Sequence, residues 1–260
     1  VSGSAGCTSA AVHTQSRFAG PSVLLNRGID LSSVRGIVAL SKNANVATGD
    51  EGLANALEIR ERVARLASCP PDRILVASTG VIGVQYPMGT VRQRLGETET
   101  SLKSVDFAAC ARAIMTTDTH AKIQSRRVGD AVVLGIAKGV GMLEPNMATM
   151  LAFFFTDAKI PARQLDLVFR RVVETTFNAV SIDTDTSTSD TAAIIANGEA
   201  GPVDINAFES ALHDCALDLV KQIARDGEGA TKLLEVTVSG ARDRAQAKRV
   251  GKTVVNSPLV

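Results

Sequence analysis

Some strand-like apolar runs of this chain follow one another without a helix between them, and this feature limits the possible folds most. Residues 130–137 and 150–155 are two such runs, separated only by a glycine-containing loop. Elsewhere strand-like runs alternate with helical patterns, as they do in α/β proteins. A purely parallel sheet needs a long crossover, usually a helix, between successive strands. We therefore expect an α/β fold with mixed sheets layered with helices.

The remaining elements follow from hydrophobic periodicity and from capping and breaking residues. The expected strands cover residues 7–13, 37–40, 73–77, 130–137, 150–155, 179–183, 191–196 and 233–238. The expected helices cover residues 48–67, 105–115 and 204–226, a segment that starts at Pro161, and residues 242–249.

Composition excludes several classes of function. The chain has 260 residues, of which 45% are hydrophobic and 21% charged, as in an ordinary soluble protein. Its net charge of +1, with no Trp and one Tyr, gives no support to nucleic-acid binding. No apolar run is long enough to cross a bilayer. The four cysteines are widely spaced, which predicts reduced thiols, a cytoplasmic protein and no metal site.

The stretch 138–151 is the strongest candidate for chemistry. Glycines punctuate it, and Ala148 and Thr149 stand near its end, before an apolar run. A backbone cut before Thr149 would leave a terminal threonine, which carries a hydroxyl nucleophile and an amine base in one residue. Neither His13 nor His120 lies in a recognisable nucleophile motif, which favours a nucleophile with its own base. The alternative is an ordinary loop that enters a core strand.

Other polar residues follow expected strands or helices. The Thr79 hydroxyl and the Gly80 amide, after a buried strand, could donate to one oxyanion, or they could form a simple turn. Lys138 could bind a substrate carboxylate and Glu228 a substrate ammonium, or both could be solvated surface residues. Residues 183–190 resemble half a calcium loop, but they lack its glycine and glutamate, so a hydrogen-bonded polar turn is preferred.

Taken together, these segments resemble the ornithine acetyltransferase (glutamate N-acetyltransferase) family of arginine biosynthesis. The resemblance is carried, in the family's order, by motifs at residues 43–49, 78–80, 115–119, 137–151, 185–191 and 228–232. It implies a precursor that cleaves itself between Ala148 and Thr149. The products would be segments 1–148 and 149–260, which share one structural core in a layered αββα fold similar to that of amino-terminal-nucleophile hydrolases.

The resemblance also implies an activity. Thr149 would take an acetyl group from N-acetylornithine as an acyl-enzyme and pass it to glutamate, a ping-pong reaction without a bound cofactor or metal. Some members also accept acetyl-CoA. Thr79 and Gly80 would form the oxyanion hole. A threonine of the Thr116–Thr117 pair, for which we favour Thr116, would contact substrate together with Lys138, Thr149 and Glu228. The implied assembly is a heterotetramer of two α and two β chains.

Two departures from the family pattern leave rival functions open. The family usually carries Asp-Gly-Asp where this chain has Asp183-Thr184-Asp185. Residues 256–260 resemble a point from which family members continue through a C-terminal portion that supplies an Asn and a Ser or Thr to the site. The rivals are a related amidase or aminopeptidase with the same nucleophile, and an inactive truncated homologue that binds amino acids.

Overall fold

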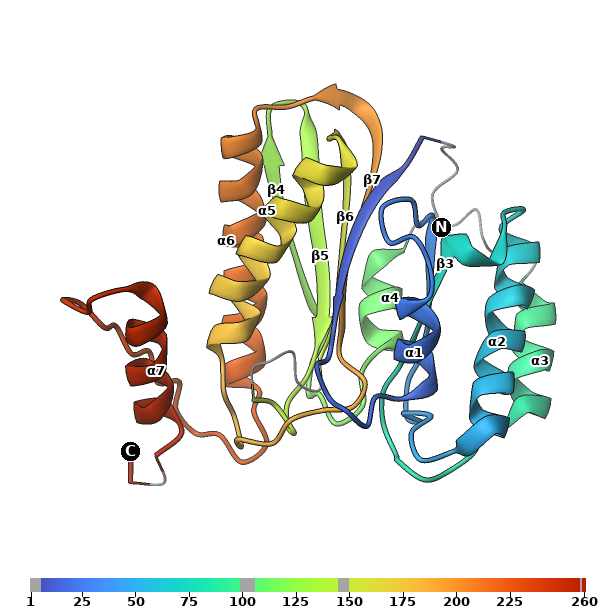
Figure 1. Ribbon diagram of the computed structural model, residues 1–260, viewed down its shortest axis with the longest axis horizontal. Helices are drawn as coiled ribbons and strands as arrows, with labels where there is room; N and C mark the ends of the chain where they lie inside the picture. The colour runs from blue at the N-terminus through green and yellow to red at the C-terminus, as the bar shows by residue number, and fades with distance from the viewer. Residues whose placement is uncertain (1–5, 99–105, 145–149, 258) are drawn as a thin grey trace.

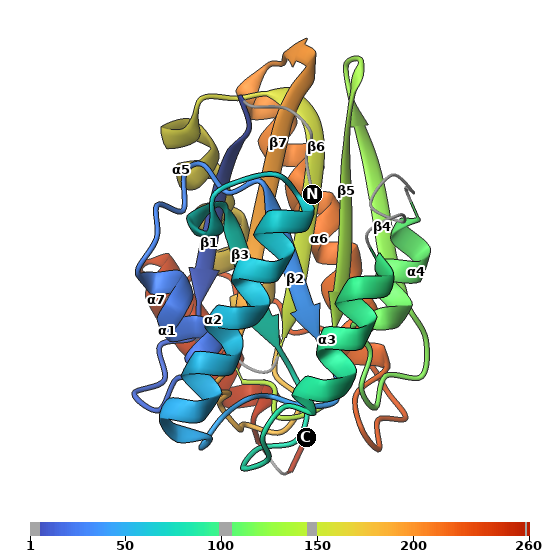
Figure 2. The same ribbon diagram turned by 90° about the vertical axis from the view of Figure 1, so that its right-hand side faces the viewer.

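Two sheets lie face to face between two layers of helices. The computed structural model describes residues 6–98, 106–144, 150–257 and 259–260. Helices α5 (Ala162–Thr175) and α6 (Ile205–Arg225) cover the outer face of a five-stranded sheet (Figure 1). A two-stranded sheet lies on its inner face, and α1 (Pro21–Arg27) and α2 (Gly49–Leu66) cover that sheet from outside (Figure 2). The predicted αββα layering of mixed sheets and helices is therefore confirmed.

The strand order makes the larger sheet mixed. Its order is β1-β7-β6-β5-β4, in which only the β6–β7 pair is parallel. The second sheet pairs β2 with β3 in parallel. The strands are β1 (Thr8–His13), β2 (Gly36–Leu40), β3 (Ile74–Ser78), β4 (Lys122–Val128), β5 (Ala131–Lys138), β6 (Leu151–Lys159) and β7 (Thr191–Pro202). The remaining helices are α3 (Met88–Glu97), α4 (Phe107–Ala113) and α7 (Arg244–Val255), with short 3₁₀ turns at Pro71–Arg73 and Phe177–Ala179.

Three consecutive phenylalanines show how β6 builds two cores at once. Successive side chains of a strand point to opposite faces. Phe154 packs edge-on against Phe169 and Phe177 beneath the outer helices, with ring centroids 6.0 Å apart in each pair. Phe155 points the other way and contacts Phe107 of α4 at 5.0 Å. Strand β6 is thus covered on both faces, as its nearly continuous apolar run requires.

Two predicted strands are wrong. Within residues 179–183, a 3₁₀ turn ends at Ala179 and the rest is loop, because the Asp183 carboxylate accepts the Met142 and Leu143 N–H groups instead of facing a strand. Residues 233–238 have the alternation of a strand but no regular structure. Among the described residues, neither edge strand, β1 or β4, pairs with them. A strand without a ladder partner leaves its backbone groups to solvent.

Three elements were not predicted from the sequence: α1, α3 and β4. Strand β4 carries Lys122, Arg126 and Arg127, so it lacks the apolar run by which the other strands are recognised. Helix α7 confirms the helix expected at 242–249 but extends further. None of its residues, all of which the structure describes, is buried, and it stands apart from the layers in Figure 1. In the described part of the chain, no helix is long and apolar enough to cross a membrane.

Candidate active site

Polar residues gather at the end of the layers where β3 and β5 finish and β6 and β7 begin. Thr79 follows β3, Lys138 is the last residue of β5, Met150 precedes β6 and Asp190 precedes β7. Ala148 and Thr149, the predicted cleavage site and nucleophile, lie outside the described residues. The candidate site is therefore described through Thr79, Lys138, Met150 and Asp190.

Lys138 links the two sheets. Its Nζ donates a hydrogen bond of 3.2 Å to Thr79 Oγ1, and both residues are buried. Burial lowers the pKa of the Lys138 ammonium, while the nearby carboxylates of Asp118, Asp190 and Glu228 act in the opposite direction. The sequence offered a solvated surface lysine as the alternative for this residue, and the burial of Lys138 excludes it.

Gly80 occupies a position that no other residue fits without rearrangement. Its φ angle is +133°, and an added Cβ would lie 2.2 Å from the Lys42 carbonyl carbon and 2.5 Å from the Asn43 nitrogen. Thr79 is held next to it by a backbone hydrogen bond of 3.0 Å to Leu40 O. Within the described ranges, the Gly80 N–H has no acceptor. A free N–H beside a threonine hydroxyl is what an oxyanion hole requires.

Glu228 is tied to two of the loops that meet here. Its N–H donates to Val140 O at 2.7 Å, and its Oε1 accepts a hydrogen bond of 2.7 Å from Thr117 Oγ1. An added Cβ on Gly141 would lie 3.0 Å from Glu228 Oε2, so the glycine makes room for the carboxylate. The structure thus places Thr117, rather than the favoured Thr116, against Glu228. Thr116 instead donates its N–H to Asp118 Oδ2 at 3.1 Å.

Asp190 is a buried carboxyl that sequence reasoning assigned only to a polar turn. It is fully buried, and its Oδ1 accepts the Met150 N–H at 2.8 Å, one residue after Thr149 in the sequence. Burial raises the pKa of this carboxyl well above its ordinary value, although the Met150 N–H, the Ser187 hydroxyl and the charge of Lys138 oppose the shift. Burial thus disfavours the charged form of this carboxyl.

Sequence reasoning missed a buried ion triad at the same end. Lys122 Nζ donates to Asp118 Oδ1 at 2.8 Å and to Asp226 Oδ2 at 2.6 Å, and the Lys122 side chain is fully buried. Lys122 begins β4, Asp118 lies in the loop before it, and Asp226 follows α6. No local sequence pattern therefore joins the three residues. The only sequence signal is a lysine that opens a strand four residues after an aspartate.

The acidic segment 183–190 is hydrogen-bonded to the loop that follows β5. Asp183 Oδ1 accepts the Leu143 N–H at 2.8 Å, and its other oxygen accepts the Met142 N–H. This is the hydrogen-bonded turn that the sequence favoured over a calcium loop. Among the described residues, no three His, Cys, Asp or Glu side chains are grouped to hold a metal ion.

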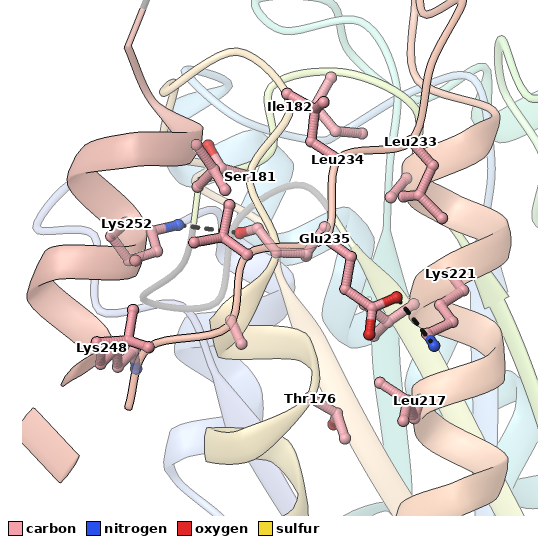
Figure 3. A pocket seen from close by; sticks show the side chains of 18 of the residues that line it. Thr176, Ser181, Ile182, Leu217, Lys221, Leu233, Leu234, Glu235, Lys248 and Lys252 are labelled. Atoms are coloured by element: carbon pink, nitrogen blue, oxygen red, sulfur yellow. Dashed lines mark hydrogen bonds and ion pairs between the residues drawn. The ribbon is translucent and has the colours of Figure 1, made fainter. Parts of the chain in front are cut away.

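A cavity of about 940 Å³ opens beside this end, between α6, residues 174–182 and the chain that leads to α7. Figure 3 shows Lys248 and Lys252 of α7 on one side and Leu217 and Lys221 of α6 on the other. Lys252 Nζ donates to Glu144 Oε2 at 2.8 Å, which attaches α7 to the layers. Of the predicted substrate residues, Glu228 lines the cavity, but Thr116 and Lys138 do not.

The chain is similar to known proteins along its whole length. The model of the ArgJ family matches residues 1–260. The chain is 61% identical over 254 residues to the glutamate N-acetyltransferase Oat2 of Streptomyces clavuligerus, covering 97% of this chain and 65% of that protein. It is 59% identical over 255 residues to the arginine biosynthesis bifunctional protein ArgJ of Rhodococcoides fascians, covering 98% of this chain and 63% of that protein. The chain thus spans just under two thirds of these relatives.

Solved structures are more distant. An ornithine acetyltransferase of Mycobacterium tuberculosis, solved with ornithine, matches with a TM-score of 0.44 and 24% identity, covering 55% of this chain and 93% of that chain. This similarity is too low to transfer any geometry, so the site described here stands on its own contacts.

Proposed function

Because the chain belongs to the ArgJ family, we propose that it forms the greater part of a glutamate N-acetyltransferase, which moves an acetyl group from N-acetylornithine to glutamate. The observation that carries the proposal is the meeting of Lys138, Thr79 and Gly80 at the end of the sheets where Met150, the residue after Thr149 in the sequence, leads into β6. A lysine, a hydroxyl and an N–H without an acceptor among the described residues stand at this end.

The proposed chemistry begins with hydrolysis of the Ala148–Thr149 peptide bond, in which one water completes the Ala148 carboxyl group and frees the Thr149 amine. The Thr149 hydroxyl attacks the acetyl carbonyl while the amine takes its proton. The Thr79 hydroxyl and the Gly80 N–H stabilise the oxyanion of the tetrahedral intermediate, and ornithine leaves with the proton. The amine of glutamate then attacks the acyl-enzyme and restores the Thr149 hydroxyl. No bound cofactor is needed, and acetyl-CoA would be an alternative donor.

The charges at the site suit amino-acid substrates. Lys122 is compensated by Asp118 and Asp226, with which it forms ion pairs. This leaves Lys138 and Glu228 as oppositely charged groups without an ion pair among the described residues. An ammonium and a carboxylate placed in this way complement the two charges of an amino-acid head group. The predicted role of Thr116 in substrate contact stays part of the proposal, and Thr117 joins it as the hydroxyl that orients Glu228.

Segments 1–148 and 149–260 would remain one body after cleavage. In support, β5, from the first segment, lies between β4 and β6, and one hydrophobic core contains Val133 as well as Phe154 and Phe169. Separation would expose this core to water. We further propose a cytoplasmic enzyme that assembles as two α and two β chains. The part of the relatives' length that this chain does not span would complete the pocket.

The test combines mass spectrometry with an acetyl-exchange assay on the full-length protein. Wild-type protein should show a cut between Ala148 and Thr149 and should transfer acetyl from N-acetylornithine to glutamate. Thr149→Ala should stay whole and inactive, and Thr253→Ala, on the exposed face of α7, should behave as wild type.

Three outcomes would contradict the proposal. An uncut protein that transfers acetyl would exclude the mechanism. Release of free acetate faster than transfer would indicate an amidase or aminopeptidase. Cleavage without turnover, with ornithine bound in calorimetry, would indicate an inactive homologue.

A further inference from the structure

The fully buried Lys122 has its charge compensated from two separate parts of the chain. Asp118 lies in the loop before β4, and Asp226 ends α6, more than a hundred residues later. The Lys122 side chain and the Asp118 side chain are 0% exposed, and that of Asp226 is 4% exposed. Taking a lysine and two carboxylates out of water costs several kcal/mol per ion, and their attraction offsets this only when the geometry is good.

Both carboxylates extend the triad into the loops of the site. Asp118 Oδ1 also accepts the N–H of Gly139 at 2.9 Å, and its Oδ2 accepts the N–H of Thr116 at 3.1 Å. Gly139 is the residue after Lys138. Asp118 therefore holds the backbone next to Lys138 and the loop that carries Thr116 and Thr117.

Asp226 holds the other side of the site. Its Oδ2 accepts the Thr119 N–H at 3.0 Å, and its Oδ1 accepts the Thr119 hydroxyl. Two residues later Glu228 bonds to Val140 O, in the loop that follows Lys138. The two carboxylates thus attach the segments that carry Glu228 and Lys138 to the same lysine.

Packing of β4 against α6 does not explain the triad. These elements already share a hydrophobic core, and Arg126 and Asp218 join them a second time by an ion pair. That pair is partly exposed, with side-chain exposures of 34% and 41%, so it costs little desolvation. A buried triad is often no more stable than apolar residues of similar volume. Stability alone therefore does not explain why a buried ion triad stands at this end of the molecule.

We propose that the Asp118–Lys122–Asp226 triad is a positioning device, which sets the distance and orientation between the two substrate-binding charges, Lys138 and Glu228. The inference rests on the proposed function for its enzymatic consequence, although its structural part does not. Lys122 touches no substrate in this scheme. It acts through the loops that its two carboxylates hold.

The test uses two sets of variants of the full-length protein. Lys122→Met combined with Asp118→Asn and Asp226→Asn removes all three charges while it keeps side-chain volumes. Asp226→Asn alone is a milder variant, should the triple variant fail to fold. The matched control is Arg126→Met combined with Asp218→Asn, which removes the other ion pair between the same strand and helix.

Two readouts separate positioning from stability. In hydrogen–deuterium exchange, the triad variants should lose protection in the three loops, at residues 116–119, 138–141 and 226–229, while β4 and α6 keep theirs. In steady-state kinetics, KM for both amino-acid substrates should rise by about tenfold or more while kcat changes less, because looser placement of the charges weakens binding. The control should alter neither readout.

The outcomes decide the inference independently of the proposed function. Unchanged protection in the three loops, or an equal effect of the control, would overturn the positioning role. If the wild-type protein transfers no acetyl group, the proposed function fails. The exchange data alone then decide, since loss of protection confined to the loops supports the triad's role and intact loops refute it.

Discussion

Replacing Gly80 by alanine should damage the protein far more than the same change three residues later. Gly80 and Gly83 both have positive φ angles, +133° and +83°. They differ in their surroundings, because a Cβ at Gly80 would meet the backbone of Lys42 and Asn43 at 2.2–2.5 Å, whereas a Cβ at Gly83 meets nothing within 4 Å. The pair therefore separates backbone strain from steric conflict.

The expected magnitudes follow from these two contributions. At Gly83, alanine loses folding free energy only because it must adopt a left-handed backbone conformation, which costs about 1–2 kcal/mol. The lower entropy of its unfolded chain offsets about 0.4–1 kcal/mol of this, so the net loss is about 1 kcal/mol. At Gly80, a φ angle that alanine rarely adopts costs about 1–3 kcal/mol. Displacing backbone atoms in a packed region adds about 1–3 kcal/mol. These costs sum to about 2–6 kcal/mol, and the same unfolded-chain offset of about 0.4–1 kcal/mol leaves a net loss centred on about 3–4 kcal/mol.

Urea denaturation of both variants of the full-length protein measures the difference. Gly80→Ala should lower the free energy of unfolding by about 2–4 kcal/mol more than Gly83→Ala, if strain and overpacking add. Gly80→Ala should also lose acetyl transfer, because the N–H proposed for the oxyanion hole moves with the backbone. Equal destabilisation by the two variants would refute the close packing of Gly80 against residues 42–43.

Three further predictions use other contacts. Burial and the charges of Arg27 and Arg170 lower the pKa of His13 from 6.5 to about 4, so the unfolded chain binds the proton more tightly and stability falls as the pH drops from about 6.5 to 4. Between pH 7 and 5, urea denaturation should show a loss of about 2 kcal/mol that His13→Phe does not share. Burial raises the pKa of the Cys215 thiol to about 12, so at pH 8 a thiol reagent should label the exposed Cys110 quickly and Cys215 only after unfolding. Equal rates for the two would contradict this. In Gly141→Ala, the new Cβ would lie 3.0 Å from the flexible Glu228 carboxylate and displace it, so substrate binding should weaken. The free energy of unfolding should change by less than about 1 kcal/mol. An unchanged KM would count against this role of Glu228.

The sequence predicted elements whose stability is local or apolar and missed those that depend on distant partners. The apolar run at 150–155 forms most of β6, and its side chains pack into hydrophobic clusters on both faces of the sheet. Strand β4 was missed because five of its seven residues are polar, and it forms by pairing with β5 and packing under α6. The run at 233–238 shows the converse. Its alternation is typical of a strand, but a strand needs a neighbour, which the described part of the chain does not offer it.

The site divides in the same way. Thr79, Gly80, Lys138 and Glu228 were found through motifs, and the structure brings Thr79 and Lys138 within 3.2 Å of each other. The threonine pair was also predicted from its motif, and the structure shows that Thr117 donates to Glu228, while the choice of Thr116 as the substrate contact stays a prediction. The partnership of Lys122 with Asp226 could not be predicted, since 104 positions separate the two residues and neither stands in a motif.

Burial of charge locates the site without any family resemblance. Among the residues that the structure describes, the charged residues that are buried are Asp118, Lys122, Lys138 and Asp190. All of them lie where β3 and β5 end and β6 and β7 begin, while the other buried residues of the described chain are apolar or uncharged polar residues. Buried charge costs free energy wherever it stands, and a fold alone would gain from spreading or removing it. Its concentration at one end, where Asp190 holds the N–H of Met150, therefore favours a role of these charges in chemistry. Acetyl transfer, hydrolysis and simple binding of amino acids would all use the same end. What separates them is the exclusion of water from the acyl-enzyme and the placement of the second substrate, and in the proposed scheme Lys138 and Glu228 provide that placement.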